Sequence, residues 1–354
     1  MNSKERVLRA VNHKLADRTA ITFDAEKEVY QMLFKHFETK EKETLFDKLN
    51  VDTWMILPRN YIYLASDSEK IEKTSIWGFK SRVTAYSGGT YEEIFHSPLA
   101  GKDELFDIKN HNWPDNDILD FSQFVPEAKA HSDRAIIGTF TWGAYFLASM
   151  VRGMEDLMID MVARKEYADH LIKTISEKSE YYLTKMLEEH GEGIDIVYMA
   201  DDTCSQLAPL FSPETFKEFV APYLKKFTSV VHKHNKKFLL HTCGSVRTFL
   251  PQIIDCGVDM LEPIQITAEG MEPAGLKRDF GEDICFYGGV DLQKVLSTYS
   301  SEKVSDEVKR LIDILGKDGG YIMGPGHTYI QPDTPLKNIL AMYKTANEYR
   351  PYKI

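Results

Sequence analysis

The chain has 354 residues, 43% of them hydrophobic and 27% charged, which is enough apolar material for a large buried core. Its net charge of −11 argues against a nucleic-acid surface, because such surfaces need clustered lysine and arginine. The sequence has no run of about 18 apolar residues and no signal-like N-terminal segment, so we expect neither a membrane-spanning helix nor secretion. Its 4 cysteines are few for a secreted disulfide scaffold, which favours reduced thiols in a cytoplasmic protein.

Residues 3–10 form an amphipathic pattern that predicts an N-terminal helical extension. After it, short apolar and β-branched segments alternate with longer helical patterns, which is typical of parallel strands joined by helices. Eight such segments are the number that closes a parallel barrel. We therefore predict one (β/α)₈ TIM-barrel domain over residues 1–354, with strands at residues 19–23, 51–57, 135–140, 194–199, 237–241, 258–262, 284–287 and 321–323.

Between these strands, Ser212 and Pro213 predict the start of a helix, because serine is a common N-cap and proline a common first helical residue. Residues 162–190 predict a long outer helix with many charge pairs at i, i+4 spacing. The segment between the second and third strands is unusually long. Its alternating residues 80–86 and the pair Gly88-Gly89 predict a β-hairpin excursion, followed by a helix, that could cover the barrel mouth.

His241 ends the predicted strand 237–241, and Cys243 lies two residues after it. Side chains at this spacing in a strand point to the same side, and the carboxyl ends of barrel strands carry catalytic residues. A neutral imidazole and a thiolate suit two positions of a tetrahedral zinc site. The alternative is a buried structural histidine beside an inert cysteine, since zinc needs at least three protein ligands.

His327 is the candidate third ligand, because it directly follows the last strand in a Gly-Pro-Gly-His turn that can present its ring to the mouth. A loop histidine bonded to backbone is the alternative. Three protein ligands would leave one zinc position open for substrate, as in catalytic sites. Glu262 and Cys204 also end strands and could replace or supplement one of the three ligands.

A second cluster accompanies the strand at residues 194–199. Asp202 is a candidate catalytic carboxylate that could orient a ligand or a metal-bound histidine. Tyr198, Asp201 and Gln206 are candidate substrate-binding residues. Asp201 and Asp202 point in opposite directions if the strand continues, so helix capping or pairing with an arginine is the alternative for one of them.

Gly289, beside Gly288 at another strand end, permits close approach of the backbone to a ligand and is a further candidate substrate contact. Asp52 is an acid within an apolar strand. We expect Asp52 either to be desolvated for catalysis or to be paired inside the core. Only the first alternative makes Asp52 a catalytic residue.

With these motifs the chain resembles the uroporphyrinogen decarboxylase superfamily over essentially its whole length. The resemblance implies a (β/α)₈ barrel with its cleft at the carboxyl ends of the strands, and an activity of either the decarboxylases or the cobalamin-dependent methyltransferases. The motifs that carry it are residues 3–10, Val51-Asp52-Thr53, Asp201-Asp202, and residues 212–219, 289–293, 326–328 and 332–335.

Decarboxylases of this superfamily resemble one another just after the first strand, where arginines pair with the carboxylates of the tetrapyrrole. Here that stretch carries Asp24 and Glu26 and no arginine, so it would repel a polycarboxylate substrate. Asp52 and His327 nevertheless match positions that decarboxylases use. The stretch after the first strand therefore speaks against porphyrinogen decarboxylation.

The methyltransferase branch, exemplified by methylcobalamin:coenzyme M methyltransferases, carries a His-x-Cys pair and a distant Cys as zinc ligands. His241 and Cys243 match the pair, whereas the distant position is His327 here. The resemblance thus implies zinc (Zn2+) held by one less negative ligand. Such a zinc ion is a better Lewis acid, which suits a methyl ether, alcohol or amine better than a soft thiolate.

We therefore predict a zinc-dependent corrinoid methyltransferase that moves a methyl group between a small methylated substrate (ether, amine or thiol) and the cobalt of a corrinoid (cobalamin) on a partner protein. The chain lacks the Asp-x-His-x-x-Gly pattern typical of corrinoid carriers, so the carrier protein would dock transiently. Three alternatives stay open: a metal-free decarboxylase-like lyase that uses Asp52, a zinc-dependent hydrolase, and a non-enzymatic binding protein. The methyl donor and acceptor, the direction of transfer and the oligomeric state, a homodimer included, are open as well.

Overall fold

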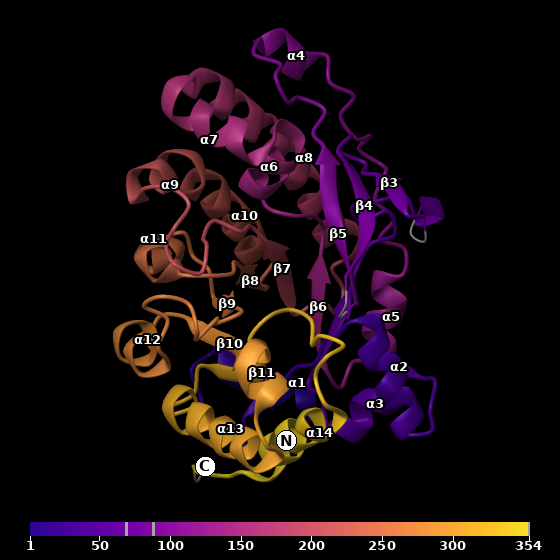
Figure 1. Ribbon diagram of the computed structural model, residues 1–354, viewed down its shortest axis with the longest axis vertical. Helices are drawn as coiled ribbons and strands as arrows, with labels where there is room; N and C mark the ends of the chain where they lie inside the picture. Colours follow the sequence, from indigo (N-terminus) through magenta and orange to yellow (C-terminus); the bar gives the residue numbers. More distant parts are fainter. Residues whose placement is uncertain (68–69, 87–88, 353–354) are drawn as a thin grey trace.

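The computed structural model describes residues 1–67, 70–86 and 89–352, and it has the predicted barrel architecture (Figure 1). Eight parallel strands form one sheet in the order β1-β11-β10-β9-β8-β7-β6-β2, so the chain passes once around the barrel. Each predicted strand segment overlaps one of them, which confirms the predicted fold class. The barrel strands are β1 (Ala20–Ile21), β2 (Thr53–Ile56), β6 (Ala135–Thr139), β7 (Ile196–Ala200), β8 (Lys237–His241), β9 (Met260–Glu262), β10 (Cys285–Val290) and β11 (Tyr321–Pro325).

Helices lie around the outside of the strands (Figure 1). The helix start at Ser212 is confirmed, because its hydroxyl accepts the Thr215 N–H at 3.2 Å. The long predicted helix is α8, and the residues just before it form α7 instead. The helices are α1 (Ser3–Val11), α2 (Lys27–His36), α3 (Lys42–Leu49), α4 (Leu105–Lys109), α5 (Phe124–Ala130), α6 (Ala144–Arg152), α7 (Met154–Ala163), α8 (Lys165–His190), α9 (Pro213–Phe219), α10 (Ala221–Lys233), α11 (Leu250–Asp255), α12 (Pro273–Phe280), α13 (Ser301–Leu315) and α14 (Leu336–Glu348), with short 3₁₀ or π turns at Ala65–Asp67, Val246–Phe249 and Leu292–Leu296.

Helix α1 closes the end of the barrel at which the strands begin. Its apolar side chains, including Val7 and Val11, are buried in one cluster with inward-facing strand residues such as Ala135 and Ile322. Both termini lie near this end of the molecule (Figure 1). Because this end is packed shut, a ligand can reach the interior only from the carboxyl ends of the strands.

Asp52 lies at the seam where β1 and β2 close the barrel, and its side chain is fully buried. The carboxylate accepts hydrogen bonds from Arg6 Nη1 at 2.6 Å, from Arg18 Nη1 at 2.5 Å and from the backbone N–H of Ile21 at 2.8 Å. The backbone N–H of Asp52 also donates to the Ile21 carbonyl at 2.8 Å. The prediction of a catalytic Asp52 is therefore corrected: the residue precedes its strand, faces the floor helix and is paired inside the core.

The excursion after β2 is a small antiparallel sheet of β3 (Glu72–Thr74), β4 (Lys80–Tyr86) and β5 (Gly89–His96), which stands beside the barrel in Figure 1. The β4–β5 pair confirms the predicted hairpin, and β3 adds a strand that its short polar sequence did not reveal. Of the predicted turn, Gly88 lies outside the described residues. Trp77 is fully buried against Trp113 and Tyr182, which ties the excursion to α8.

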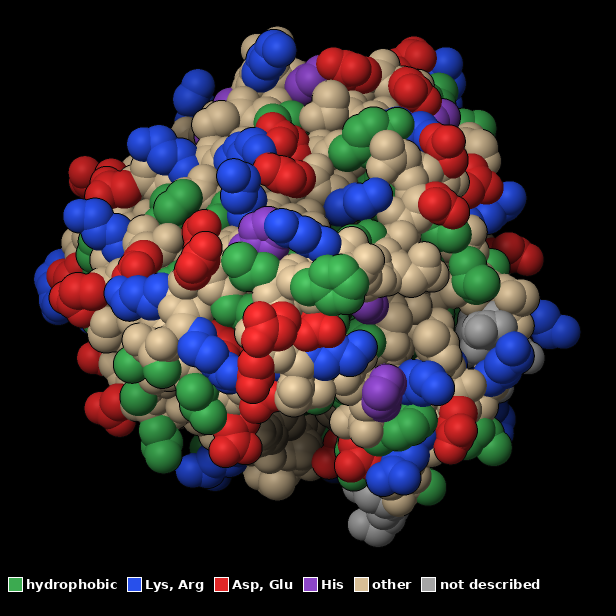
Figure 2. Space-filling view, turned by 90° about the horizontal axis from the view of Figure 1, so that it is seen from above, with side chains coloured by type: hydrophobic (Ala, Val, Ile, Leu, Met, Phe, Trp, Pro, Cys, Tyr) green, Lys and Arg blue, Asp and Glu red, His purple; other side chains and the backbone are tan. Residues whose placement is uncertain are grey.

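Charged side chains of both signs share the face of the molecule that Figure 2 shows. On the face shown in Figure 2, lysine and arginine are interspersed with aspartate and glutamate rather than gathered into one basic patch. Within the described ranges, every helix is too short or too polar to cross a bilayer.

Candidate metal centre

The structure brings together three donor side chains at the carboxyl ends of β7 and β8. His241 Nε2 lies 3.3 Å from Cys243 Sγ and 3.7 Å from Asp202 Oδ1. One donor atom from each of these residues lies within 4.8 Å of the other two. The side chains form a compact imidazole, thiol and carboxylate cluster at the mouth of the barrel.

Glu262 holds the other nitrogen of the His241 ring. Residues 241 and 262 are partners in the parallel pair β8–β9, and Nδ1 of His241 lies 2.5 Å from Glu262 Oε2. The ring therefore donates Nδ1–H to the carboxylate and turns Nε2 toward Cys243. We predicted Glu262 as a metal ligand, but the structure places it behind the histidine, where a carboxylate fixes the ring orientation.

His327 lies beside this cluster on the loop after β11. Its ring centroid is 6.3 Å from that of His241, and it is a hydrogen-bond partner of Cys243. The next residue, Thr328, reaches Nδ1 of His241 through its hydroxyl at 3.2 Å. This loop thus brings a second imidazole to the thiol, while its role as the third metal ligand stays a prediction.

The charges of the cluster support a thiolate. Burial disfavours charge on Cys243, but the neighbouring His241 and His327 outweigh it and lower the pKa of the thiol. Burial opposes protonation of His241 as well, yet Glu262 and Cys243 raise the pKa of its ring well above the ordinary value. The hydrogen bond to Cys243 likewise raises the pKa of His327. Thiolates are the form of cysteine that binds metals.

The loop that follows the cysteine is shaped for this position. Gly244 has a φ of +89°, and a Cβ atom there would lie 2.3 Å from the carbonyl oxygen of Ser205. Its N–H donates to Gln265 Oε1 at 3.0 Å. A glycine is required here because the backbone both turns through a positive φ and packs against another loop.

Asp201 and Asp202 point in opposite directions, and only Asp202 reaches the cluster. Asp202 Oδ1 accepts the Cys243 N–H at 2.8 Å. Asp201 is buried, accepts the Phe146 N–H at 2.8 Å, and so caps the start of α6. The prediction that Asp201 binds substrate is thus corrected to the capping alternative, since its oxygens are directed at backbone N–H groups of α6.

The other predicted substrate contacts divide as well. Tyr198 lines the cavity beneath the cluster, with its ring centroid 6.1 Å from that of His241. Gly289 instead faces the protein: a Cβ atom there would lie 3.1 Å from Ile264, so the space that glycine leaves is filled by packing and not by a ligand. Gln206 is exposed, and its carbonyl accepts the N–H of Glu269 at 2.9 Å.

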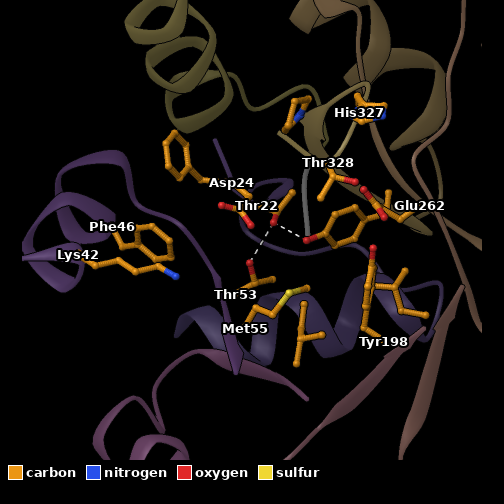
Figure 3. Close-up of a pocket in the computed structure, with 15 residues that line it drawn as sticks. Thr22, Asp24, Lys42, Phe46, Thr53, Met55, Tyr198, Glu262, His327 and Thr328 are labelled. Carbon is orange, nitrogen blue, oxygen red and sulfur yellow. Dashed lines mark hydrogen bonds between the residues drawn. The ribbon is translucent and has the colours of Figure 1, made fainter. Parts of the chain in front are cut away.

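The cavity has a volume of about 40 Å³ and a polar wall that the sequence did not reveal (Figure 3). Thr22 Oγ1 lies 3.0 Å from Thr53 Oγ1 and is also bonded to the Tyr287 hydroxyl. In a sequence, threonines and tyrosines that line a cavity have the same strand spacing as those that pack in a core. The sequence therefore did not identify these three residues as cavity-lining.

Asp24 also faces this cavity and stands opposite Glu262 and His327 in the close-up (Figure 3). Burial raises the pKa of Asp24 to about 6, although Lys42 opposes the shift. A signal for this residue did exist, because Asp24 follows the first predicted strand just as His241 ends another.

The donor set fits zinc. Imidazole, thiolate and carboxylate are its usual protein ligands, and catalytic zinc takes three of them. Cys204 is a poorer donor, because burial raises the pKa of its thiol to about 11. The donor atoms that lie within reach of one ion belong to Asp202, His241 and Cys243, and the His327 ring lies beside them.

Comparisons with known proteins point to one family. A family model described as uroporphyrinogen decarboxylase (URO-D) matches residues 116–349. A methylcobamide:CoM methyltransferase MtaA from Methanosarcina barkeri is 30% identical over 236 residues, which are 66% of this chain and 63% of that protein. A uroporphyrinogen decarboxylase from Nitratiruptor sp. is 24% identical over 225 residues, or 60% of each chain. The matches thus span less than two thirds of the relatives' own length.

Among solved structures, a methyltransferase from Methanosarcina mazei has a TM-score of 0.69 to this chain. The superposition covers 98% of this chain and 99% of that one at 19% identity, a likeness that shows the shared barrel fold. Since the family model covers more than half of the sequence, the chain belongs to the uroporphyrinogen decarboxylase family.

Proposed function

We propose that the protein is a zinc-dependent methyltransferase that moves a methyl group between a small methylated substrate and the cobalt of a corrinoid on a partner protein. The observation that carries the proposal is the imidazole, thiol and carboxylate cluster, whose donor atoms lie within 4.8 Å of one another. The similarity to a protein named methylcobamide:CoM methyltransferase supports methyl transfer as the reaction.

Each residue of the cluster has a distinct role in this proposal. His241, Cys243 and His327 would hold the zinc ion, which when bound would polarise the heteroatom that bears the methyl group. Glu262 keeps Nδ1 of His241 protonated, so that Nε2 remains the coordinating nitrogen. Asp202 fixes the Cys243 backbone through Oδ1, and the same oxygen lies 3.7 Å from His241 Nε2.

The cavity next to the cluster suits the reacting end of a small substrate. Its volume of about 40 Å³ admits a group of a few heavy atoms. Burial, together with Glu262 nearby, raises the pKa of Tyr198 well above its ordinary value, so the phenol stays protonated and can donate a hydrogen bond. Tyr198 would position the substrate rather than act as a base.

The ligand set favours an oxygen or nitrogen donor over a thiol. Two imidazoles and one thiolate place less negative charge on zinc than two thiolates and one imidazole would, which strengthens the Lewis acid. We therefore expect a methyl ether or amine to react better than free coenzyme M. Efficient methylation of coenzyme M, in preference to any methyl ether, would contradict this.

The alternatives are less well supported by the site. A metal-free lyase that used Asp52 would need this acid at the mouth, whereas Asp52 lies at the floor of the barrel in contact with Arg6 and Arg18. A zinc hydrolase would use the same ligands to activate water. Release of product without any corrinoid would identify the hydrolase, and substrate affinity without turnover would identify a binding protein.

The decisive experiment is the zinc content per chain, measured by plasma mass spectrometry in parallel preparations. We expect about one zinc in the wild type and little in the Cys243→Ala, His327→Ala double variant. Cys204→Ala is the matched control, because this nearby cysteine is protonated and should leave the zinc content unchanged. Methyl transfer from a methyl ether to cob(I)alamin would then be assayed with the same proteins. Absence of zinc from the supplemented wild type would refute the proposal.

A further inference from the structure

Asp24 is a half-buried acid in the wall of the cavity beneath the metal cluster. The same wall includes Tyr198 and His327, which lie across the cavity from it in the close-up (Figure 3). His327 is a hydrogen-bond partner of the Cys243 thiol, so the cavity reaches the cluster itself. Because the cavity has a volume of only about 40 Å³, a small group that fills it contacts both sides. Such a group would lie between Asp24 and the metal centre.

The backbone around Asp24 is joined to the loop that carries His327. The Asp24 carbonyl accepts the N–H of Ile330 at 3.1 Å, and the Glu26 N–H donates to the Ile330 carbonyl at 3.0 Å. Ala25 and Ile330 are thus paired as in a parallel sheet, three residues after His327. These two hydrogen bonds hold the acid and the histidine in a fixed relation on either side of the cavity, as a reacting constellation requires.

The hydrogen bonds of Asp24 distinguish its two carboxyl oxygens. Oδ1 accepts the N–H of Ala25 at 2.9 Å and the hydroxyl of Tyr30 at 3.1 Å. Oδ2 has no hydrogen-bond partner within the part of the chain that the structure describes. In a neutral carboxylic acid one oxygen only accepts and the other carries the proton. Since Oδ1 already accepts two donors, a protonated Asp24 carries its proton on Oδ2, which is free to donate it to a ligand.

The charges near Asp24 favour this protonated form. Among the described residues Asp24 forms no ion pair. Lys42 of α3 lines the same cavity, but its Nζ lies 5.1 Å from the ring centres of both Phe46 and Trp54. Burial raises the pKa of Asp24 to about 6, and the negative charge of Glu262 on β9 adds to the shift, although Lys42 opposes it.

The other ionisable groups around Asp24 do not supply the missing counter-charge. His327, from the loop after β11, is engaged by the Cys243 thiol. The phenols stay neutral, because burial raises the pKa of each of them: Tyr30, Tyr287, Tyr329 and Tyr343. A carboxyl group without an ion-pair partner in such a site is suited to hold a proton and to release it to a ligand.

We propose that Asp24 is the acid of the methyl transfer, and that its Oδ2–H gives first a hydrogen bond and then its proton to the heteroatom from which the methyl group departs. The inference rests on the proposed function and adds a catalytic residue to it. A heteroatom that gains a proton while its bond to carbon breaks leaves as a neutral group rather than as an anion. General acids of this kind accelerate reactions about 10²–10⁴-fold.

In the demethylating direction the bond between the heteroatom and the methyl group breaks, and its electron pair stays on the heteroatom. The proton of Asp24 passes to that atom, and Asp24 becomes a carboxylate that regains a proton from water. The methyl group passes to the Co(I) of the partner protein's reduced corrinoid. The cobalt electron pair forms the new carbon–cobalt bond, so that cobalt becomes Co(III).

The kinetic test is single-turnover methyl transfer to cob(I)alamin by the zinc-loaded protein, with anisole, methanol and dimethylamine as donors. With the best of these donors, Asp24→Asn should be at least about 100-fold slower at a pH near 6, with little change in KM, since the amide still donates a hydrogen bond but cannot give up a proton. The wild-type rate should fall as the pH rises above about 6, and the variant should lack this fall. Asp24→Glu should recover part of the rate.

Two further measurements separate an acid from a structural residue. Zinc content should be the same in Asp24→Asn and in the wild type. Infrared spectra of protein labelled with ¹³C-aspartate should show a carboxylic acid band in the wild type at about pH 5 that is missing from Asp24→Asn. Glu28→Gln is the matched control, because Glu28 is an exposed acid on α2 outside the cavity wall, and this variant should match the wild type in every assay.

The outcomes distinguish this inference from the proposed function. If the wild type transfers methyl groups and Asp24→Asn does so at the same rate or with the same pH profile, the function stands and the role of Asp24 is overturned. Loss of zinc from Asp24→Asn, or absence of the acid band from the wild type, would overturn that role as well. If the wild type transfers no methyl group from any of the three donors, the proposed function fails and the role of Asp24 fails with it.

Discussion

Replacing Asp52 by asparagine should destabilise the protein without affecting the metal centre. In the wild type the buried carboxylate faces Arg6 and Arg18, with contacts of 2.6 Å and 2.5 Å. Removing one partner of a buried ion pair costs about 3–5 kcal/mol, because a charge is left uncompensated. Arg6 keeps a second carboxylate, Asp17, at 2.7 Å, so we expect about 3 kcal/mol, the lower end of this range.

The assay is urea unfolding followed by circular dichroism, with the zinc content of the folded protein measured in parallel. Asp120→Asn is the control, because Asp120 and its partner Arg59 are 40% and 61% exposed and such pairs contribute at most about 1 kcal/mol. Both variants should keep the zinc of the wild type. An Asp52→Asn protein as stable as the wild type, yet depleted in zinc or inactive, would refute the assignment of this residue to the barrel seam.

Three further predictions concern the mouth of the barrel. Glu262→Gln should weaken zinc binding about 10–100-fold in a chelator competition, because the amide no longer holds the His241 ring as a carboxylate does, and unchanged affinity would contradict that role. Asp24→Asn should remove a pH dependence of stability, because the pKa of Asp24 in the folded protein, about 6, lies above its ordinary 3.8. The wild type should therefore lose stability relative to the variant as pH rises from about 4 to about 6. Parallel stability profiles for the two proteins would contradict the raised pKa of Asp24. Gly143→Ala should destabilise the protein by about 1–3 kcal/mol and displace the cap of α6, since the new Cβ atom would lie 2.2 Å from Asp201 Cγ. Thermal unfolding measures the effect, and an unfolding temperature equal to that of the wild type would show that the start of α6 can move to make room.

The barrel could be predicted because its signal is repeated. Each buried parallel strand is a short apolar run, and each of the eight runs was found within a few residues of its observed bounds. Strand β3, which adds to the predicted hairpin of β4 and β5, was not predicted because it has no such apolar run. Its three residues are polar and partly exposed, and its pairing with β4 depends on a turn around Trp77 rather than on a local pattern.

The candidate site could be predicted only where the chemistry lies next to a strand end in the sequence. His241, Cys243 and Asp202 were found in this way, and the structure brings their donor atoms together. An open groove beside the small sheet, lined by Tyr61, Trp142 and Tyr329 among others, could not be predicted from the sequence, because these residues come from three distant segments of the chain. Their convergence follows from how the loops pack, which an individual sequence does not encode in a visible spacing.

The error at Asp52 follows from the direction of the strands. In a parallel barrel the residues before each strand gather at one end and the residues after it gather at the other. Asp52 precedes β2, whereas His241 ends β8, Glu262 ends β9 and Asp202 follows β7. The same residue type therefore has opposite uses in this fold: at the floor, an acid neutralises arginines and closes the barrel, and at the mouth it positions the groups that would hold a metal. Position relative to the strand, rather than the presence of an acid in an apolar run, separates the two uses.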